Sequence, residues 1–503
     1  MSEPRAFPLE ETTVADLQAR MGSGELTARA VTESYLQRIE ELDRSGPVLR
    51  SVIEVNPDAL EIADALDAER RERGPRGPLH GIPVLVKDNI DTADAMKTTA
   101  GSLALLGARP VRDAAVVDRL REAGGVVLGK TNLSEWANFR STRSTSGWSA
   151  RGGQCRNPYA LDRNPCGSSS GSAVAVSANL CALAIGTETD GSILCPASVN
   201  GVVGIKLTVG LVSREGIVPI SHSQDTAGPM ARTVADATIL LQALAGADPR
   251  DPATADVPGD LDLAGALEAT GLVGTRIGVA RNMAGFHDRV DIVFEDILEA
   301  LRGLGAELID PADVPHADEL EDHELEVLLY EFKADLEAYL ATLGGEALRT
   351  LAELIAFNER HRDVEMPLFG QELFLKANEK GPLTEPAYLE ALATCRRLSR
   401  AEGIDAVMDE HRLDALVAPT GGPAWVTDPV NGDHYVGGNT TPAAVAGYPS
   451  VTVPAGFAFE LPVGVSFIGR AWSEPTLIRI AHAFERATGH RRPPAFAPQA
   501  SMR

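Results

Sequence analysis

The sequence predicts an α/β protein with one large mixed or mostly parallel sheet and helices on both faces. Short β-branched runs such as GIPVLVKDNI (81–90) and VVLGK (126–130) alternate with helical segments, which is typical of layered α/β folds. Strand-like runs recur to the end of the chain, at RIGVA (276–280), ALVAP (415–419) and SVTVP (450–454). No repeat, low-complexity tract or obvious linker separates them, so we expect a single domain over residues 1–503.

We expect three regions along this domain. N-terminal helices are expected over about 10–70, where glycines break an amphipathic pattern into separate helices. The core is expected over about 80–245, and within it SGSAVAVSANLCALAIG (170–186) reads as a helix of small residues that leads into a strand. A helical region rich in charge covers about 318–400. Small side chains in the core helix predict close packing against the sheet.

The charge and the hydropathy of the chain exclude several kinds of partner. The chain has 46 basic and 71 acidic side chains and a net charge of −25, which disfavours nucleic acid and anionic membranes. No run approaches 18 apolar residues, so we expect no membrane span. The first residues, MSEPRAFPLEETTVADL, contain no basic stretch followed by an apolar one. We therefore expect a cytoplasmic protein, with export of a longer precursor left open.

The cysteines and histidines predict neither a disulfide framework nor a metal site. The five cysteines are an odd number without CxxC spacing, which favours a reduced compartment and free buried thiols. The ten histidines form no HExxH motif. We expect no metal and no organic cofactor.

Two short motifs match known patterns only formally. GGVVLGKT (124–131) fits the phosphate-loop pattern, but Val126, Val127 and Leu128 belong to a buried strand and not to a loop that cradles phosphate. GSSSG fits the nucleophile-elbow pattern around Ser169, but a Pro- and Asn-rich loop precedes it where an elbow needs a strand.

The serine-rich loop therefore needs another base if it is catalytic. His482 and His490 are poorly placed for a Ser-His-Asp arrangement, because one lies in an amphipathic helix and the other in a basic tail. Helix capping by the triple serine is the structural alternative.

Lys87 is a candidate base for a serine nucleophile. It follows the apolar run IPVLV, which places its stem in the sheet and its amine at the end of a strand. A lysine base must be neutral, so its pKa has to fall from about 10.4 to roughly 7–8. The alternative is a surface lysine paired with Asp88 or Asp91.

Three segments together resemble the amidase signature family. They are GIPVLVKDNI, the stretch CGSSSGSAVAVSANLCALAIGTETDGSILCPASVNGVVGIKLT (166–208), and SQDTAGPMARTVADA (223–237). The resemblance extends over essentially the whole chain. Segments such as KTNLSEWANF, GTETDGSI and LYEFKADLE are most similar to the bacterial peptide amidases of this family.

The resemblance implies a Ser–cis-Ser–Lys triad. Carried over by motif position, Ser192 is the nucleophile, Ser168 the bridging serine after a cis peptide bond, and Lys87 the terminal base. Four backbone N–H groups in the turn at the nucleophile are expected to form the oxyanion hole. They belong to Thr189, Asp190, Gly191 and Ser192.

The motifs also contain three charged residues, Asp190, Arg232 and Asp225, whose orientation or contacts can be predicted. Many family members have glycine at the position of Asp190, and a carboxylate that faced a developing oxyanion would oppose catalysis. The side chain of Asp190 should therefore point away. Arg232 and Asp225 are expected to tie loops around the site through buried polar bonds.

The implied activity is hydrolysis of a carboxamide, foremost the C-terminal amide of peptides, to the acid and ammonia. No obligatory protein partner is expected. Helices between about 320 and 375 and the loop Gly421 to Gly438 are expected to form the pocket walls. Three alternatives stay open: the catalytic subunit of a glutamine-dependent tRNA amidotransferase, a broad-specificity amidase on small or aryl amides, and a catalytically dead binding protein.

Overall fold

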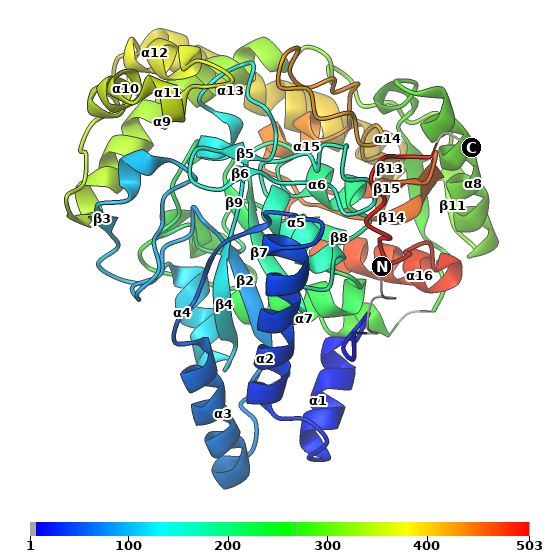
Figure 1. The fold of residues 1–503 in the computed structure, drawn as a ribbon. Helices are drawn as coiled ribbons and strands as arrows, with labels where there is room; N and C mark the ends of the chain where they lie inside the picture. The colour runs from blue at the N-terminus through cyan, green and yellow to red at the C-terminus, as the bar shows by residue number, and fades with distance from the viewer. Residues whose placement is uncertain (1–6, 269, 502–503) are drawn as a thin grey trace.

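All the strands expected from the sequence take part in one mixed sheet (Figure 1). The computed structural model describes residues 7–268 and 270–501. Its sheet strands are β1 Val52–Val55, β2 Pro83–Lys87, β4 Val126–Thr131, β7 Leu183–Glu188, β8 Val203–Lys206, β9 Thr226–Ala231, β10 Arg276–Val279, β11 Glu307–Ile309, β13 Ala415–Pro419, β14 Ser450–Ala458 and β15 Leu461–Ile468.

Within the described residues the sheet has 11 strands in the order β1-β4-β2-β7-β9-β8-β14-β15-β13-β10-β11. Pairing is parallel in β4–β2–β7 and in β13–β10–β11, and antiparallel elsewhere. Strand β2 is buried along its whole length, which explains its continuous apolar run. Two short pairs lie outside the sheet, β3 (Ala108–Arg109) with β12 (Gly344–Gly345) and β5 (Trp148–Ser149) with β6 (Gly153–Gln154).

Helices flank this sheet, and the expected mixed α/β fold is confirmed. The N-terminal helices are α1 Val14–Gly22, α2 Ala28–Arg38 and α3 Ala59–Arg73. The helices of the core are α4 Ala115–Glu122, α5 Ser170–Ser177, α6 Leu194–Val199, α7 Val234–Leu244, α8 Asp288–Gly303, α14 Asp405–His411, α15 Thr441–Ala446 and α16 Glu474–Thr488. Short helical turns cover Ile39–Arg44, Leu103–Leu105, Glu135–Asn138, Pro252–Asp256, Gly265–Leu267, Arg281–Met283 and Arg397–Ile404.

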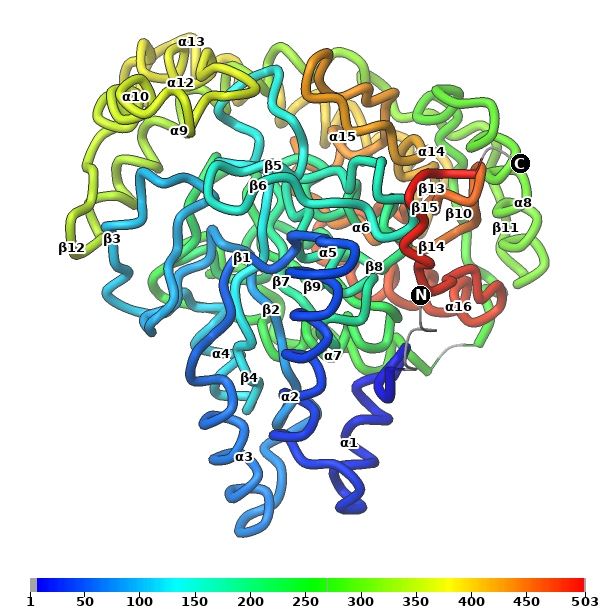
Figure 2. The backbone as a smooth tube through the Cα atoms, in the orientation of Figure 1, coloured from blue at the N-terminus to red at the C-terminus, as the bar shows by residue number. Residues whose placement is uncertain are grey.

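A helical region gathers at one end of the molecule, away from the lower ends of α1–α3 (Figure 2). It consists of α9 Glu321–Thr342, α10 Leu351–Arg360, α11 Arg362–Glu365, α12 Glu372–Asn378 and α13 Pro386–Arg396. Its own apolar cluster joins Phe332 and Phe374 to Trp136 and Phe139 of the core. This cluster packs α9 against the segment that follows β4.

The small-residue helix α5 packs closely on the core, as its composition predicts. A Cβ at Gly171 would collide with the backbone oxygens of Ser51 and Asn132, so only glycine allows this approach. Because β2 and β7 are parallel neighbours, their carboxyl ends lie at the same edge of the sheet. Residues that follow these two strands therefore come together.

No helix among the described residues is both long enough and apolar enough to cross a membrane.

Candidate active site

Lys87 is buried at the end of β2 and hydrogen-bonded to Ser168. Its Nζ donates to Ser168 Oγ at 2.8 Å, to Thr187 Oγ1 at 2.8 Å and to the Thr187 carbonyl at 3.2 Å. The side chain is fully buried. The surface alternative is therefore wrong: Asp88 pairs with Arg151, and Asp91 accepts from Tyr339.

Burial lowers the pKa of Lys87 from 10.5 to about 7, against the charges of Asp225 and Glu188, which act to raise it. A lysine with a pKa near neutrality can accept a proton from a hydroxyl at pH 7–8. Because the amine is buried at the end of a strand, Lys87 has the lowered pKa that a lysine base requires.

Ser168 stands at the start of the loop that leads into α5. The Gly167–Ser168 peptide bond is cis, as the resemblance implies. A Cβ at Gly167 would displace the Ser134 hydroxyl. The Ser168 carbonyl accepts from Ser134 N at 3.1 Å, which ties the loop to the segment that follows β4.

Ser192 lies in the turn between β7 and α6, next to this loop. Its carbonyl accepts from Ser169 N at 3.0 Å, and the residue is 7% exposed. Gly191 has a φ of 73°, a conformation that favours glycine. The backbone bond places the segment of Ser192 beside the residue that follows Ser168.

The turn at Ser192 presents backbone donors to the site. Among the described residues, the N–H groups of Asp190, Gly191 and Ser192 donate to no protein acceptor. Oxyanion holes are commonly formed by backbone N–H groups that have no other acceptor. The Asp190 carboxylate accepts from Thr441 Oγ1 at 2.7 Å, so Thr441 anchors the side chain at the start of α15.

Glu188 was not expected from the sequence, and it braces the same turn. Its Oε2 accepts from Ile193 N at 2.6 Å and from Leu194 N at 2.9 Å. Anions are favourable at a helix start, and α6 begins at Leu194. An acidic residue at the end of a strand, a few residues before a helix, was the available signal in the sequence.

Asp225 and Arg232 differ in their relation to the site. Asp225 accepts from the hydroxyl of Thr189 and from the N–H groups of Ile220 and Ser221, and burial raises its pKa to about 6. Arg232 instead donates to the carbonyls of Thr12, Val176 and Cys181. Arg232 thus makes the buried structural bonds that were expected of it, but they lie at the opposite end of β7, so its expected place around the site is wrong.

The other two serines of the triple serine hold the loop and do not cap the helix, which was the structural alternative for this segment. Ser169 and Ser170 make no side-chain cap of α5. The hydroxyl of Ser169 instead donates to the Thr187 carbonyl at 2.9 Å, and that of Ser170 to the Cys166 carbonyl at 2.5 Å. Ser169 thus links the loop to the strand end that holds Lys87, and Ser170 links the start of α5 back to the residues before Ser168.

A cavity of about 300 Å³ lies beside the partners of Lys87. Its walls include Thr187, Thr189 and Asp225 from the core and Ala338 and Tyr339 from α9. Part of the helical region expected as a pocket wall thus lines this cavity. The loop 421–438 lines a separate cavity of about 420 Å³ that includes Trp425 and Asp433.

One cluster of side chains has the residue types of a metal site. Its members are His222, Glu331 and Asp335, and their ligand atoms lie within 4.8 Å of one another. The two ring nitrogens of His222 face different carboxylates, Nδ1 at 2.9 Å from Asp335 and Nε2 at 3.3 Å from Glu331. The hydrogen bond to Asp335 and the charge of Glu331 raise the pKa of His222. This arrangement suits an imidazolium between two carboxylates rather than a metal ligand.

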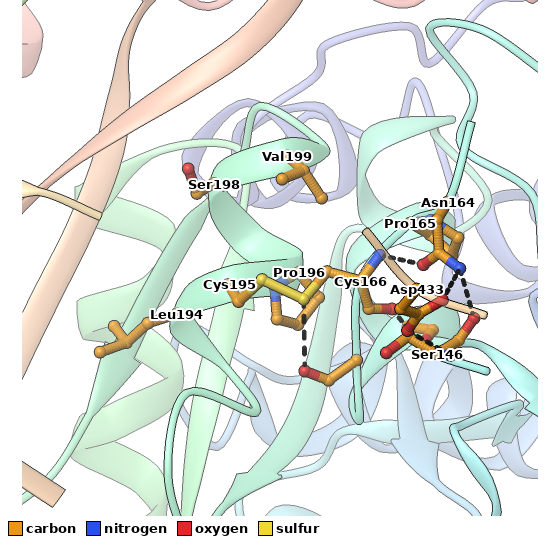
Figure 3. The surroundings of a disulfide bond; sticks show 12 residues. Ser146, Asn164, Pro165, Cys166, Leu194, Cys195, Pro196, Ser198, Val199 and Asp433 are labelled. Atoms are coloured by element: carbon orange, nitrogen blue, oxygen red, sulfur yellow. Dashed lines mark hydrogen bonds between the residues drawn. A yellow bond between two sulfur atoms is a disulfide. The ribbon is translucent and has the colours of Figure 1, made fainter. Parts of the chain in front are cut away.

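The cysteines contradict the expectation of free thiols throughout. Cys166 and Cys195 form a disulfide (Figure 3), while Cys155, Cys181 and Cys395 are free and buried. No local pattern indicated this pair, because the two residues are 29 positions apart and only the fold brings them together.

Comparison with known proteins agrees with this fold. The Amidase family model matches residues 30–478. A probable amidase of Arabidopsis thaliana is 44% identical over 97% of this chain and 92% of its own length. A glutamyl-tRNA(Gln) amidotransferase chain of Halorhodospira halophila is 36% identical over 95% of this chain and 98% of its own length.

The chain belongs to the amidase family, an amide-hydrolysing class of enzymes, as the resemblance implied. Among solved structures it is similar to the native peptide amidase of Stenotrophomonas maltophilia. That structure is 57% identical, with a TM-score of 0.93, and the match covers 98% of this chain and 100% of the other.

Proposed function

We propose that this protein hydrolyses the C-terminal carboxamide of peptides to the peptide acid and ammonia, with Ser192 as the nucleophile. The observation that carries the proposal is the 2.8 Å hydrogen bond between buried Lys87 and Ser168, beside the turn of Ser192. A serine needs a neighbouring base to attack an amide, and the described residues around this turn offer a lysine where histidine enzymes have an imidazole.

In the acylation step, Ser192 Oγ attacks the amide carbonyl carbon. Its proton passes to Ser168, while the proton of Ser168 passes to neutral Lys87. The negative charge that develops on the carbonyl oxygen is accepted by the N–H groups of the turn 189–192, each worth about 3 kcal/mol in such sites. When the C–N bond breaks, the relay returns the proton to the leaving nitrogen, and ammonia departs.

In the deacylation step, water attacks the ester on Ser192 and loses its proton to the same relay. The acid is released, and Ser192 recovers its hydroxyl. The proposal includes no metal and no organic cofactor, because Lys87 and Ser168 move every proton and the backbone stabilises every oxyanion. Run in low water, the same acyl-enzyme could take ammonia as its acceptor and amidate a peptide acid.

The likeness to a peptide amidase supports the choice of substrate. So does the cavity of about 300 Å³ beside Thr187 and Thr189, because it provides room for a residue of the peptide next to the reacting bond. A broad-specificity amidase on small or aryl amides would share the relay and differ only in how it uses this space.

A second candidate is the catalytic subunit of a tRNA-dependent amidotransferase, which the 36% identity to a chain of such an enzyme favours. That function needs partner proteins and charged RNA. The net charge of −25 repels RNA unless partners contribute the contacts. The isolated chain would then hydrolyse glutamine in preference to peptide amides.

The test is the release of ammonia from a panel of amides by the isolated chain. Dipeptide amides, glutamine, a fatty amide and an aryl amide should be compared, with Ser192→Ala as the inactive variant. We expect dipeptide amides to have the highest kcat/KM. Preference for glutamine would favour the second candidate, and full activity of Ser192→Ala would refute the assignment of the nucleophile.

A further inference from the structure

We propose that the Cys166–Cys195 disulfide positions the two serines of the relay, so that the oxidised protein is the efficient catalyst. This inference rests on the proposed function. Cys166 lies two residues before Ser168, and Cys195 lies three residues after Ser192. The bond therefore joins the two segments that must meet for a proton to pass between these serines.

Hydrogen bonds also join these two segments, and Ser169 Oγ exchanges two further bonds with the backbone of Thr187, at the end of β7 just before the turn. The backbone bond from Ser169 N to the Ser192 carbonyl is 3.0 Å long, and Asn200 adds a bond from its amide to the Pro165 carbonyl at 2.9 Å. A single backbone hydrogen bond contributes only about 1 kcal/mol net. The covalent bond is thus the strongest direct link between the loop before α5 and the turn before α6.

Hydrogen bonds also connect each cysteine to the backbone near its serine. Cys195 N donates to the Gly191 carbonyl at 2.8 Å, and Ser170 Oγ donates to the Cys166 carbonyl at 2.5 Å. On the other side, Cys166 N donates to Asn164 Oδ1 at 2.8 Å, and Figure 3 shows this amide reaching Ser146 and Asp433. A shift of either sulfur would therefore move the turn of Ser192 or the loop of Ser168.

The disulfide is buried under the loop 421–438. Cys166 is 6% and Cys195 7% exposed, and they pack with Ala424 and Trp425 of the loop 421–438. A dithiol could reach one sulfur by displacing this cover. A thiolate of the dithiol attacks that sulfur, and the second thiol of the reagent then closes a ring. Two electrons and two protons pass to the protein, which gains two thiols, while the reagent becomes a cyclic disulfide.

The expected effect is on kcat. A misplacement of about 1 Å in a reacting group can lower the rate by about 100-fold, so we expect reduction to lower kcat by about 10- to 100-fold. KM should change little, because the walls contributed by α9 are not attached to the disulfide. A merely structural disulfide would lower the melting temperature and leave kcat unchanged below that temperature.

The experiment compares the oxidised protein, the protein treated with dithiothreitol, and the double variant Cys166→Ala/Cys195→Ala, all held well below their melting temperatures. We expect both altered forms to lose kcat on a dipeptide amide while their near-ultraviolet circular dichroism stays native. Dithiothreitol should have no further effect on the double variant. Cys395→Ala, which removes a free buried thiol on α13, is the matched control and should keep the kcat of the oxidised protein.

A second measurement separates this inference from the choice of substrate. The rate at which a fluorophosphonate labels Ser192 reports the reactivity of the serine without any amide. If no panel amide is hydrolysed but reduction still slows labelling, the substrate proposal fails and the positioning role stands. Kcat and labelling rates within twofold of the oxidised protein, or losses that only accompany unfolding, would overturn the positioning role. A protein that neither hydrolyses amides nor takes the label would refute both.

Discussion

At the residue scale, the proposed mechanism depends on one lysine, Lys87, that burial keeps from being permanently charged. Lys87 has three oxygen acceptors around its amine and no carboxylate in direct contact among the described residues. Desolvation is therefore the leading cause of its lowered pKa of about 7. A carboxylate bonded to the amine would have favoured the charged form and removed the base at neutral pH.

The pH dependence of the reaction follows from this value. Below about pH 7 Lys87 is protonated and cannot take a proton, so kcat/KM should fall about tenfold per pH unit on the acid side. Above that value the activity should level off. A pH–rate profile on a dipeptide amide measures this, and a rate that stays flat down to pH 4 would contradict a lysine base.

Removal of the bridging serine should stop the reaction without unfolding the protein. Ser168→Ala removes the hydroxyl that is proposed to pass the proton from Ser192 to Lys87, and we expect kcat/KM to fall by about 10³-fold or more. Lys87→Met should do the same. Ser177→Ala is a suitable control, because Ser177 is equally buried on α5 and its hydroxyl has no partner among the described residues.

Thermal unfolding of these three variants distinguishes the loss of proton transfer from the loss of the folded structure. Melting temperatures close to that of the parent protein, with activity lost only in Ser168→Ala and Lys87→Met, are the expected pattern. Wild-type activity in Ser168→Ala would rule out a relay through this hydroxyl.

Much of the site could be anticipated from single residues, but not the contacts between them. The apolar run before Lys87 indicated a buried stem, and that expectation was correct. The roles of Thr187 and Glu188 depend on the pairing of β2 with β7 and on the start of α6. The disulfide depends on two loops that meet only in the fold. Such tertiary contacts leave no local pattern in a sequence.

At the element scale, the helix α9 joins the helical region to the site. Tyr339 on α9 donates to Asp91 Oδ1 at 2.8 Å, and Ala338 lines the cavity beside Thr189. His222 of the loop after β8 binds Asp335 of the same helix. The strands and helices themselves were predictable from periodicity, whereas the seating of α9 required the apolar cluster around Phe332.

Filling the cavity from α9 should change substrate preference. Ala338→Trp places a large ring at the cavity wall, so we expect KM for dipeptide amides with bulky side chains to rise about tenfold or more. Activity on a small amide should persist, because the relay is untouched. Ala341→Trp is the matched control: it is exposed on the same helix and does not line the cavity. Equal effects of the two variants on KM would show that this cavity does not hold the peptide.

At the scale of the whole molecule, buried carboxyl groups should make stability fall as the pH rises. Burial raises the pKa of Asp225 to about 6, of Asp91 to about 7 and of Glu485 to about 8. In the unfolded chain these groups lose their protons near pH 4. The folded state therefore holds more protons between pH 5 and pH 7, so the free energy of unfolding decreases across that interval.

The melting temperature should accordingly be lower at pH 7 than at pH 5, at constant ionic strength. The growing net negative charge acts in the same direction. Glu485→Gln removes one of the groups and should flatten the slope. A melting temperature that rises from pH 5 to pH 7 would contradict the protonated state of these side chains. Activity and stability are thus expected to have opposite pH dependences in this range.

The cytoplasmic location expected from the sequence stays a prediction, and the disulfide weighs against it. Structural disulfides persist mainly in oxidising compartments and are rare in the cytosol. Fractionation of cells that produce the protein, with thiols trapped at lysis, would show in which compartment the oxidised form occurs.

The spacing of basic residues around the disulfide has a practical consequence. Between Arg163 and Lys206 the chain has no lysine or arginine, so trypsin releases residues 164–206 as one peptide. That peptide contains both serines of the proposed relay, both bonded cysteines and the free Cys181. If the denatured protein is alkylated before digestion, one added group marks the oxidised state and three mark the reduced state. The mass of this one peptide thus shows whether the disulfide was present and whether either serine carried a label.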